Sequence, residues 1–272
     1  MTEMLMAIES IDKPLILQLV ALAKNAGERM MPFYQSTNLA IADKADTSPL
    51  TAADLASHDC IVAGLQAINC HWPILSEESD LPSWSVRKGW SRYFLIDPLD
   101  GTKEFIKGNG EFTVNIAVID NGQAIAGVVY APAKGHCYFG ALGLGAWVQA
   151  DGMMAQPLGQ ERQHSQACPV IVGSRSHPSP ELAGYLSQFS DYQVLPVGSS
   201  LKFCLLAEGR ADIYPRLGPT SEWDTAAAQA VLEAAGGQVH DKTTGKPLRY
   251  NQKDSIRNPH FIAYARQWLV SI

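Results

Sequence analysis

Tyr93-Phe94-Leu95-Ile96 runs directly into Asp97-Pro98-Leu99-Asp100-Gly101-Thr102. The first four residues are apolar and are followed by Pro and Gly, which predicts a short buried strand. Both carboxylates therefore leave the strand where the chain turns, and their like charges raise each other's pKa. A hard divalent cation such as Mg2+ removes that conflict because it prefers carboxylate oxygens as ligands. Taken alone, the hexapeptide is equally compatible with an ordinary acidic turn.

Composition restricts the class of protein around this stretch. A chain of 272 residues suits one large domain or two closely packed halves, and 46% hydrophobic with 18% charged residues is typical of a globular enzyme. A formal net charge of -6 argues against a general binder of nucleic acid polymers. The five cysteines contain no CxxC pair, so neither a disulfide framework nor a zinc site is expected.

The chain carries no pattern of a targeting or membrane-spanning segment. No apolar run approaches the ~18 residues that a membrane span needs, and the opening MTEMLMAIES lacks the basic region of a signal peptide. We therefore expect a cytoplasmic protein. A peripheral association with the cytoplasmic face of the inner membrane would leave no such trace, so this alternative and the oligomeric state stay open.

The N-terminal part predicts two helices followed by strands. Leucines and alanines at helical spacing predict a helix over 13–35, and a second helix begins at Thr51 with Asp54 in its first turn. Asp54 there suits the helix dipole, although its place after a polar, Lys-containing loop also suits catalysis. A strand over 72–75 leads into acidic residues, and the pattern over 111–149 predicts antiparallel strands joined by tight turns.

The C-terminal part alternates between strands and helices, which favours an α/β arrangement. A polar stretch over 151–167 is the candidate boundary, and it divides the chain into halves 1–160 and 161–272. Residues 198–202, Gly-Ser-Ser-Leu-Lys, open a predicted helix and form either an anion site or an ordinary helix cap. Asp224, at the start of a long apolar helix, has the equally simple explanation of an N-cap.

Four carboxylates indicate a metal site only when they are considered together. Each follows a predicted strand or begins a predicted helix, and no His or Cys cluster with zinc-like spacing accompanies them: Glu77, Asp97, Asp100 and Asp224. Ligands that offer only oxygen indicate Mg2+ or a related hard ion. Two such ions can clamp a phosphoryl group, activate a water molecule and stabilise the leaving oxygen.

Three motifs carry a resemblance to a known family, in that family's order and over essentially the whole chain: Ser76-Glu77-Glu78-Ser79, residues 97–102 and Trp223-Asp224-Thr225-Ala226-Ala227. The chain resembles the Mg2+-dependent, lithium-sensitive phosphatases of the inositol monophosphatase superfamily. Residues 100–107, 111–117 and 198–204 make it most similar to the bacterial 3'(2'),5'-bisphosphate nucleotidase branch. The resemblance implies an α+β or α/β fold, the layered αβαβα sandwich, with the site between two packed halves.

The resemblance also implies a metal site. Glu77, Asp97 and the Leu99 carbonyl would hold a first Mg2+, and Asp97, Asp100 and Asp224 a second, with Asp97 bridging the two ions. A third, weaker ion near Glu77 is compatible with the pattern, and Li+ is expected to inhibit by occupying the second position. Apart from Asp97, the same residues count among the expected substrate contacts.

Water activation and substrate binding are implied in the same way. Asp54 and the Thr102 hydroxyl would orient and deprotonate the attacking water. The N–H groups of Gly101 and Thr102 would contact the phosphate that is cleaved. Four further residues match the family's contacts to the nucleotide and its second phosphate: His177, Ser199, Lys202 and Arg216.

The implied reaction is hydrolysis of 3'-phosphoadenosine 5'-phosphate to AMP and phosphate, within sulfur assimilation. The sulfonated nucleotide 3'-phosphoadenosine 5'-phosphosulfate is a candidate second substrate. One alternative is an inositol monophosphatase or inositol polyphosphate 1-phosphatase with the same metal chemistry. Another, from a different class, is a catalytically silent regulator that binds metal or nucleotide. The presence of both Asp54 and Thr102 argues against the regulator, because a binder needs no pair that activates water.

Overall fold

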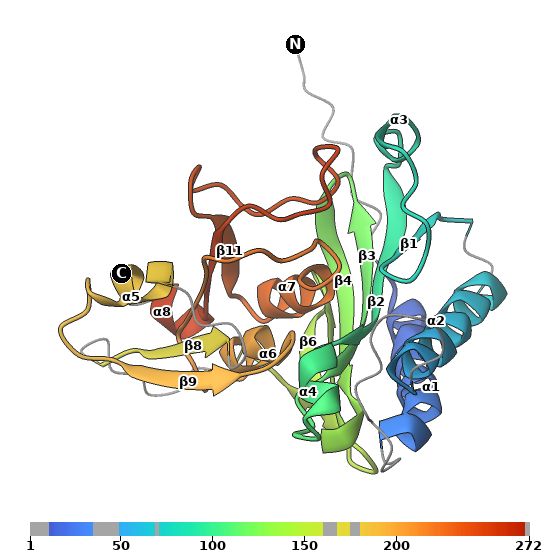
Figure 1. Ribbon diagram of the computed structural model, residues 1–272, viewed down its shortest axis with the longest axis horizontal. Helices are drawn as coiled ribbons and strands as arrows, with labels where there is room; N and C mark the ends of the chain where they lie inside the picture. The colour runs from blue at the N-terminus through green and yellow to red at the C-terminus, as the bar shows by residue number, and fades with distance from the viewer. Residues whose placement is uncertain (1–10, 35–48, 69–70, 160–167, 175–179, 270–272) are drawn as a thin grey trace.

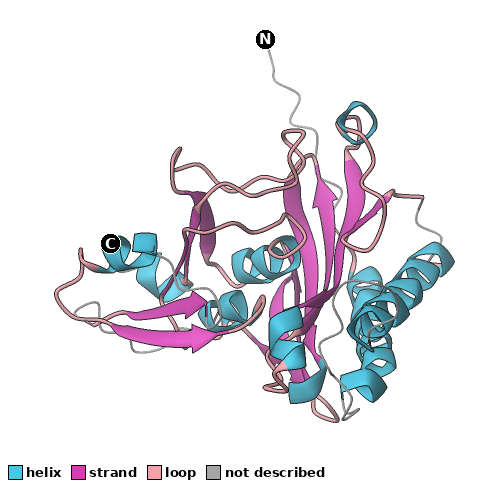
Figure 2. Cartoon of the chain, in the orientation of Figure 1, coloured by secondary structure: helices cyan, strands magenta, loops and turns pink. Residues whose placement is uncertain are grey.

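The computed structural model describes residues 11–34, 49–68, 71–159, 168–174 and 180–269 (Figure 1). Its elements form five layers in which helix pairs alternate with two sheets (Figure 2). Three apolar clusters fill the spaces between successive layers. Each sheet therefore buries both of its faces, and the αβαβα sandwich expected from the sequence is confirmed.

The first sheet contains seven strands that lie side by side in chain order. β1 runs parallel to β2, and the other neighbouring strands are antiparallel. Every residue of β3 is buried, as expected for a central strand of a sheet that is covered on both faces. The strands are β1 (Ile74–Ser76), β2 (Arg92–Asp100), β3 (Thr113–Asp120), β4 (Gln123–Ala131), β5 (His136–Ala141), β6 (Gly145–Ala150) and β7 (Gln156–Pro157).

Two long helices, α1 (Lys13–Tyr34) and α2 (Pro49–Ala67), cover one face of this sheet. The buried positions of α1 recur every three or four residues, from Ile16 to Met30, so one stripe of the helix packs against β3 and β4. α1 is the helix predicted over 13–35. Two short helices, α3 (Trp84–Arg87) and α4 (Thr102–Ile106), flank β2, and η1 (Pro132–Lys134) follows β4.

The second sheet has the strand order β11-β12-β10-β8-β9. Helices α6 (Leu201–Ala207) and α7 (Ala226–Ala234) lie between the two sheets, and α5 (Pro180–Leu186) and α8 (Arg266–Leu269) cover the outer face (Figure 1). The strands are β8 (Val170–Ser174), β9 (Gln193–Val197), β10 (Ile213–Arg216), β11 (Gln238–Asp241) and β12 (Phe261–Tyr264).

One strand end differs from the expectation. The strand predicted to finish at Ile96 continues to Asp100, with a register shift between Asp97 and Asp100. Asp97 pairs with Asn115 and Asp100 pairs with Thr113, so the chain between the two acids bulges out of the ladder. Pro98 cannot donate a ladder hydrogen bond, and a bulge is one of the few places where a sheet accepts proline.

Gly127 lets α7 approach the first sheet closely. A Cβ added at Gly127 would lie 2.0 Å from the Ala227 carbonyl oxygen, which belongs to the first turn of α7. Because this contact is with backbone, no side chain can rotate away to make room. The glycine therefore brings the start of α7, and the residues just before it, against β4.

Gly127→Ala is expected to reduce the free energy of unfolding by about 1–3 kcal/mol, because the added methyl group overpacks this contact. Chemical denaturation monitored by circular dichroism measures the change. Gly184→Ala is the matched control, since Gly184 lies within α5 and a Cβ there meets nothing within 4 Å. Alanine favours a helix over glycine by up to about 1 kcal/mol, so the control should not destabilise the protein. Equal stability of both variants would contradict the close approach.

Candidate metal-binding active site

The parallel pairing of β1 and β2 brings two acidic strand ends together. Ser76 is in register with Ile96, and the Glu77 N–H donates to the Ile96 carbonyl oxygen at 3.3 Å. Glu77, which follows β1, therefore lies beside Asp97, which lies within β2. Within the bulge the Leu99 N–H donates to Asp97 Oδ1 at 3.1 Å, which fixes the orientation of this buried carboxylate.

Asp224 reaches the same point from the second half of the chain. One carboxylate oxygen each of Glu77, Asp97 and Asp224 lies within 4.8 Å of the others. Asp224 does not cap α7, because that helix begins at Ala226 with Thr225 as its N-cap residue. Its Oδ2 instead accepts from Thr220 Oγ1 at 2.7 Å and from the Ser221 N–H at 2.9 Å. These two donors hold the carboxylate toward the acidic cluster rather than toward the helix.

Ser200, which the sequence analysis did not single out, connects two of the acids. Its N–H donates to Asp100 Oδ2 at 2.6 Å, and its Oγ lies 2.7 Å from that oxygen and 2.7 Å from the Asp224 carbonyl oxygen. Asn115 Nδ2 donates to the same Oγ at 2.8 Å. No sequence signal separates Ser200 from its neighbour Ser199, since only the helix geometry decides which serine faces the acids.

Burial and mutual repulsion raise the pKa values of these carboxyl groups. Desolvation, followed by the charges of Asp100 and Glu77, raises the pKa of Asp97 well above its usual range. Desolvation followed by Asp224 also raises the pKa of Asp100. Desolvation, then the charges of Asp224 and Asp100, raises the pKa of Glu77 to about 7, although Glu77 is the most exposed member and water screens part of this effect.

The donor set fits a hard divalent cation. Three carboxylates converge, and a bound cation would remove the repulsion that raises their pKa values. Leu99 lines the same cavity of about 250 Å³ as Glu77, Asp97, Asp100 and Asp224. The cluster found among the described residues consists of carboxylates and contains no His or Cys side chain. Such ligands favour hard cations such as Mg2+, Ca2+ or Mn2+.

The two residues expected to activate water lie on different elements. Thr102 is the first residue of α4 and lines the cavity, whereas Asp54 lies on α2 and is not among the lining residues. Asp54 is nevertheless close enough for its charge to raise the pKa of Asp97. Burial, followed by the charges of Glu78 and Glu77, raises the pKa of Asp54 itself to about 8.

The residues that follow Asp54 hold helix α2 against the turn at Pro98 and against the end of β1. Ser57 Oγ donates to the Pro98 carbonyl oxygen at 2.8 Å, and His58 Nδ1 lies 2.9 Å from Ser76 Oγ. Gly101, which connects the turn to α4, has a φ of 95°, and a Cβ there would lie 3.0 Å from the Glu111 carbonyl oxygen. A side chain at this position would therefore be strained.

Three of the four further expected substrate contacts line the same cavity as the carboxylates. Ser199, Lys202 and Arg216 line it, and His177 lies outside the described residues. Lys202 Nζ is buried and donates to the carbonyl oxygens of Val197 and Ser199. Burial lowers the pKa of Lys202 to about 8, against the opposing charge of Asp100.

Two aromatic residues that line this cavity were not expected from the sequence. Phe203 and Tyr214 line the cavity and pack edge to face, with ring centroids 5.1 Å apart. Both also appear as ordinary core residues, with 1% and 4% of their surface exposed. The apolar pattern of their helix and strand therefore carries no signal that distinguishes them from packing residues.

None of the described helices is long and apolar enough to cross a membrane.

Comparison with known proteins identifies the chain's relatives. The 3'(2'),5'-bisphosphate nucleotidase CysQ of Escherichia coli strain K12 is 51% identical over 245 residues, which cover 90% of this chain and 97% of that protein. The protein of the same name from Buchnera aphidicola is 40% identical over 264 residues, 95% of this chain and 96% of that one.

The fold is shared with solved structures of this class. The crystal structure of CysQ from Bacteroides thetaiotaomicron, described as a bacterial member of the inositol monophosphatase family, superposes with a TM-score of 0.84 at 39% identity. It covers 93% of this chain and 98% of that one. The inositol monophosphatase family matches residues 12–268. The chain therefore belongs to the inositol monophosphatase family, as the three motifs predicted.

Proposed function

We propose that the chain is a Mg2+-dependent 3'(2'),5'-bisphosphate nucleotidase that hydrolyses 3'-phosphoadenosine 5'-phosphate to AMP and phosphate. The phosphatase class follows from the family and from relatives that are up to 52% identical. One observation supports the bisphosphate in particular. A single cavity is lined both by the carboxylate cluster and by the cationic side chains of Lys202 and Arg216. A substrate with two phosphates can use the proposed metal ligands and these cations at once.

Different residues of the chain would bind the metal ions, activate water and bind the substrate. Glu77, Asp97, Asp100, Asp224 and the Leu99 carbonyl would hold two Mg2+ ions, with a weaker third near Glu77. The ions would supply Lewis-acid chemistry, stabilising the negative charge that develops on phosphoryl oxygens and making water more acidic. Li+ would compete at the second position.

The remaining steps belong to side chains and backbone. The Thr102 hydroxyl would orient the attacking water and Asp54 would accept its proton, which suits a carboxyl group whose pKa is raised to about 8. The N–H groups of Gly101 and Thr102 would hold the phosphate that is cleaved. His177, Ser199, Lys202 and Arg216 would bind the nucleotide and the phosphate that stays, and Glu77, Leu99, Asp100 and Asp224 would complete the substrate contacts.

The cellular setting follows from the same proposal. The substrate would be a by-product of sulfate reduction, so the enzyme would act in sulfur assimilation, with 3'-phosphoadenosine 5'-phosphosulfate as a second substrate. We further propose a cytoplasmic location, with peripheral binding to the inner membrane as the alternative. The halves 1–160 and 161–272 would each supply residues that line the cavity, and the separate sheets over 74–157 and 170–264 support this division.

Steady-state phosphate release tests the proposal. The purified chain is assayed with 3'-phosphoadenosine 5'-phosphate, its phosphosulfate analogue, inositol 1-phosphate and inositol 1,4-bisphosphate, in Mg2+, in EDTA and in Mg2+ plus Li+. We expect the highest kcat/KM for the adenosine bisphosphate, no activity in EDTA and inhibition by millimolar Li+. Preference for inositol phosphates would identify an inositol phosphatase instead, and no release from any substrate would favour a silent binder.

Lys202→Ala is expected to raise the KM for the adenosine bisphosphate by about tenfold or more, because a charge-assisted contact to the second phosphate is lost. The KM for a simple nucleoside monophosphate should change far less. Lys134→Ala, on the exposed η1 turn, is the control that removes the same charge away from the cavity. Equal effects of Lys202→Ala on both substrates would remove Lys202 from the recognition set.

Stabilisation by Mg2+ should increase with pH. The pKa of Glu77 is raised from 4.5 to about 7, and that of Asp97 is raised well above its usual range, so the folded protein binds more protons than the unfolded chain in this window. The stability that these groups contribute is present below about pH 4 and is lost as the pH rises through about 7. Mg2+ takes the place of those protons at neutral pH.

Differential scanning fluorimetry at constant ionic strength measures the effect. With saturating Mg2+ we expect a Tm increase of about 5 °C or more near pH 8, and an increase of under about 2 °C near pH 5.5. Buried carboxyl groups elsewhere alter the Tm equally with and without Mg2+. The difference in Tm between the two samples therefore reports on the carboxylate cluster alone. A Mg2+ effect that is independent of pH would contradict the assignment of these carboxylates as ligands.

A further inference from the structure

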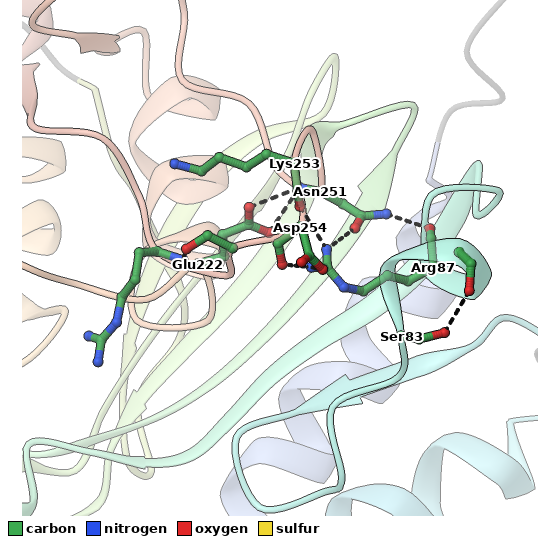
Figure 3. Close-up of polar contacts among 9 residues, drawn as sticks. Ser83, Arg87, Glu222, Asn251, Lys253 and Asp254 are labelled. Carbon is green, nitrogen blue, oxygen red and sulfur yellow. Dashed lines mark hydrogen bonds and ion pairs between the residues drawn. The ribbon is translucent and has the colours of Figure 1, made fainter.

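A buried arginine outside the cavity connects the two halves of the chain. Arg87 ends α3, in the excursion between β1 and β2, and its surface is 0% exposed (Figure 3). Its Nη1 donates to Asn251 Oδ1 at 2.6 Å and to the Lys253 carbonyl oxygen at 3.1 Å, and its Nη2 donates to the Asp254 carbonyl oxygen. A side chain from the first half thus holds residues that lie more than 160 positions further along the chain.

Asn251 is hydrogen-bonded to both Arg87 and Glu222. Its Nδ2 donates back to the Arg87 carbonyl oxygen at 2.6 Å, so the two residues are joined in both directions. The Asn251 N–H donates to both carboxylate oxygens of Glu222, at 2.9 and 3.0 Å (Figure 3). Asn251 has a φ of 53°, a conformation that asparagine and glycine adopt more readily than other residues. Both Glu222 and Asn251 are buried.

Residues 251–258, which we call the strap, hold the segment that precedes Asp224. The Glu222 N–H donates to the Ile256 carbonyl oxygen at 2.9 Å, and the Asn258 N–H donates to the Thr220 carbonyl oxygen at 2.9 Å. Asn258 Nδ2 also donates to the Ser221 carbonyl oxygen at 2.7 Å. The strap therefore fixes Thr220 and Ser221, the two residues whose donors orient the Asp224 carboxylate.

The charges of Arg87 and Glu222 favour this connection. Arg87 and Glu222 carry opposite charges, both are removed from water, and Asn251 bridges them. Asp254 adds a carboxylate oxygen 3.7 Å from Arg87 Nη2, but its side chain is 83% exposed. Removing one member of such a buried set leaves the other charge without its partner, so alternative arrangements of the strap are disfavoured.

We propose that Arg87 is a positioning residue for the metal site: through Asn251, Glu222 and the strap it sets the distance of Asp224 from Glu77 and Asp97. The proposal rests on the proposed function, in which these three carboxylates bind Mg2+. The excursion that carries Arg87 begins just after Glu77 and ends in β2, which carries Asp97. Arg87 thus joins the segment that supplies two of the ligands to the segment that supplies the third.

Asn251→Gly is the sharpest test. Glycine keeps the positive φ and the N–H that binds Glu222, and it removes only the amide that joins Arg87. Mn2+ binding to the metal-free enzyme, followed by electron paramagnetic resonance without substrate, is the primary measurement. We expect the weaker Mn2+ site to lose about tenfold in affinity, the lower end of the loss seen when a direct partner of a ligand is removed, because Asn251 acts on Asp224 through Glu222 and the strap. The Mg2+ concentration for half-maximal activity should rise in parallel, with kcat at saturating Mg2+ largely kept.

Two further variants complete the design. Arg87→Met should show the larger loss of Mn2+ affinity if it folds, and Asn251→Gly carries the test if it does not. Asn121→Gly is the matched control, because Asn121 has a similar φ of 49° in the turn between β3 and β4 and its side-chain amide donates to Asp120 Oδ1 at 3.3 Å rather than to Arg87. It should bind Mn2+ like the wild type.

The possible outcomes separate this proposal from the proposed function. A Mn2+ isotherm of Asn251→Gly that coincides with the wild type, whatever happens to its Tm, would overturn the positioning role and leave Arg87 a residue of stability alone. A wild-type enzyme that binds Mn2+ but hydrolyses none of the phosphates would overturn the proposed function instead. Weakened Mn2+ binding in Asn251→Gly alone, with Asn121→Gly unchanged, supports the positioning role in either case.

Discussion

Asp97→Asn is expected to reduce Mg2+-dependent phosphate release by about 10³-fold or more, because Asp97 is the proposed ligand of both ions. The same substitution should raise the Tm of the metal-free protein. Burial and four neighbouring acids raise the pKa of Asp97, so a neutral side chain of the same shape relieves repulsion that the native carboxylate creates. The Oδ1 of asparagine can still accept from the Leu99 N–H. Loss of activity with a gain of stability is the signature of a ligand.

Scanning fluorimetry with and without Mg2+ distinguishes this explanation from simple damage to the fold. The Asp97→Asn protein should gain no Tm from Mg2+. Asp120→Asn is the control, because Asp120 is also buried on the first sheet but pairs with Arg92 at 3.1 Å. It should lower the Tm and keep the response to Mg2+. An Asp97→Asn enzyme that retains wild-type activity would refute the bridging role.

Asp54→Asn should lower kcat by about 10²–10⁴-fold, the usual contribution of a general base, and leave Mg2+ binding in place. Asp54 lies on α2 outside the cavity lining, so its loss removes proton transfer without removing a ligand. The Mg2+-induced rise in Tm should therefore match that of the wild type. Single-turnover phosphate release measures the chemical step directly.

Asp59→Asn provides the comparison on the same helix. Asp59 is exposed on α2, so the substitution makes the same chemical change at a position that faces solvent. Its kcat should equal that of the wild type. If Asp54→Asn instead raised the Mg2+ concentration needed for activity while kcat at saturation stayed unchanged, Asp54 would act on metal binding rather than on water.

The layered fold and the family could be predicted because their signals are local in the sequence. The helix predicted over 13–35 follows from the spacing of its apolar residues, and the Asp120-Asn121-Gly122 turn follows from its positive-φ residues. Two boundaries could not be predicted in the same way. β2 continues past Ile96 to Asp100 and α7 begins after Asp224, because pairing with β3 and hydrogen bonds from Thr220 and Ser221 override local preferences.

The sequence by itself determined which chemistry is available: hard oxygen ligands at Glu77, Asp97, Asp100 and Asp224, since the affinity of a carboxylate for Mg2+ is a property of the side chain. Only the tertiary structure decided how these groups meet. Their convergence depends on the register of β1 with β2 and on the contact of α7 at Gly127. It also assigned Ser200 and Arg87 to the site, because their roles depend on contacts with residues about 100 or more positions away, and such contacts leave no periodic or local pattern in the chain.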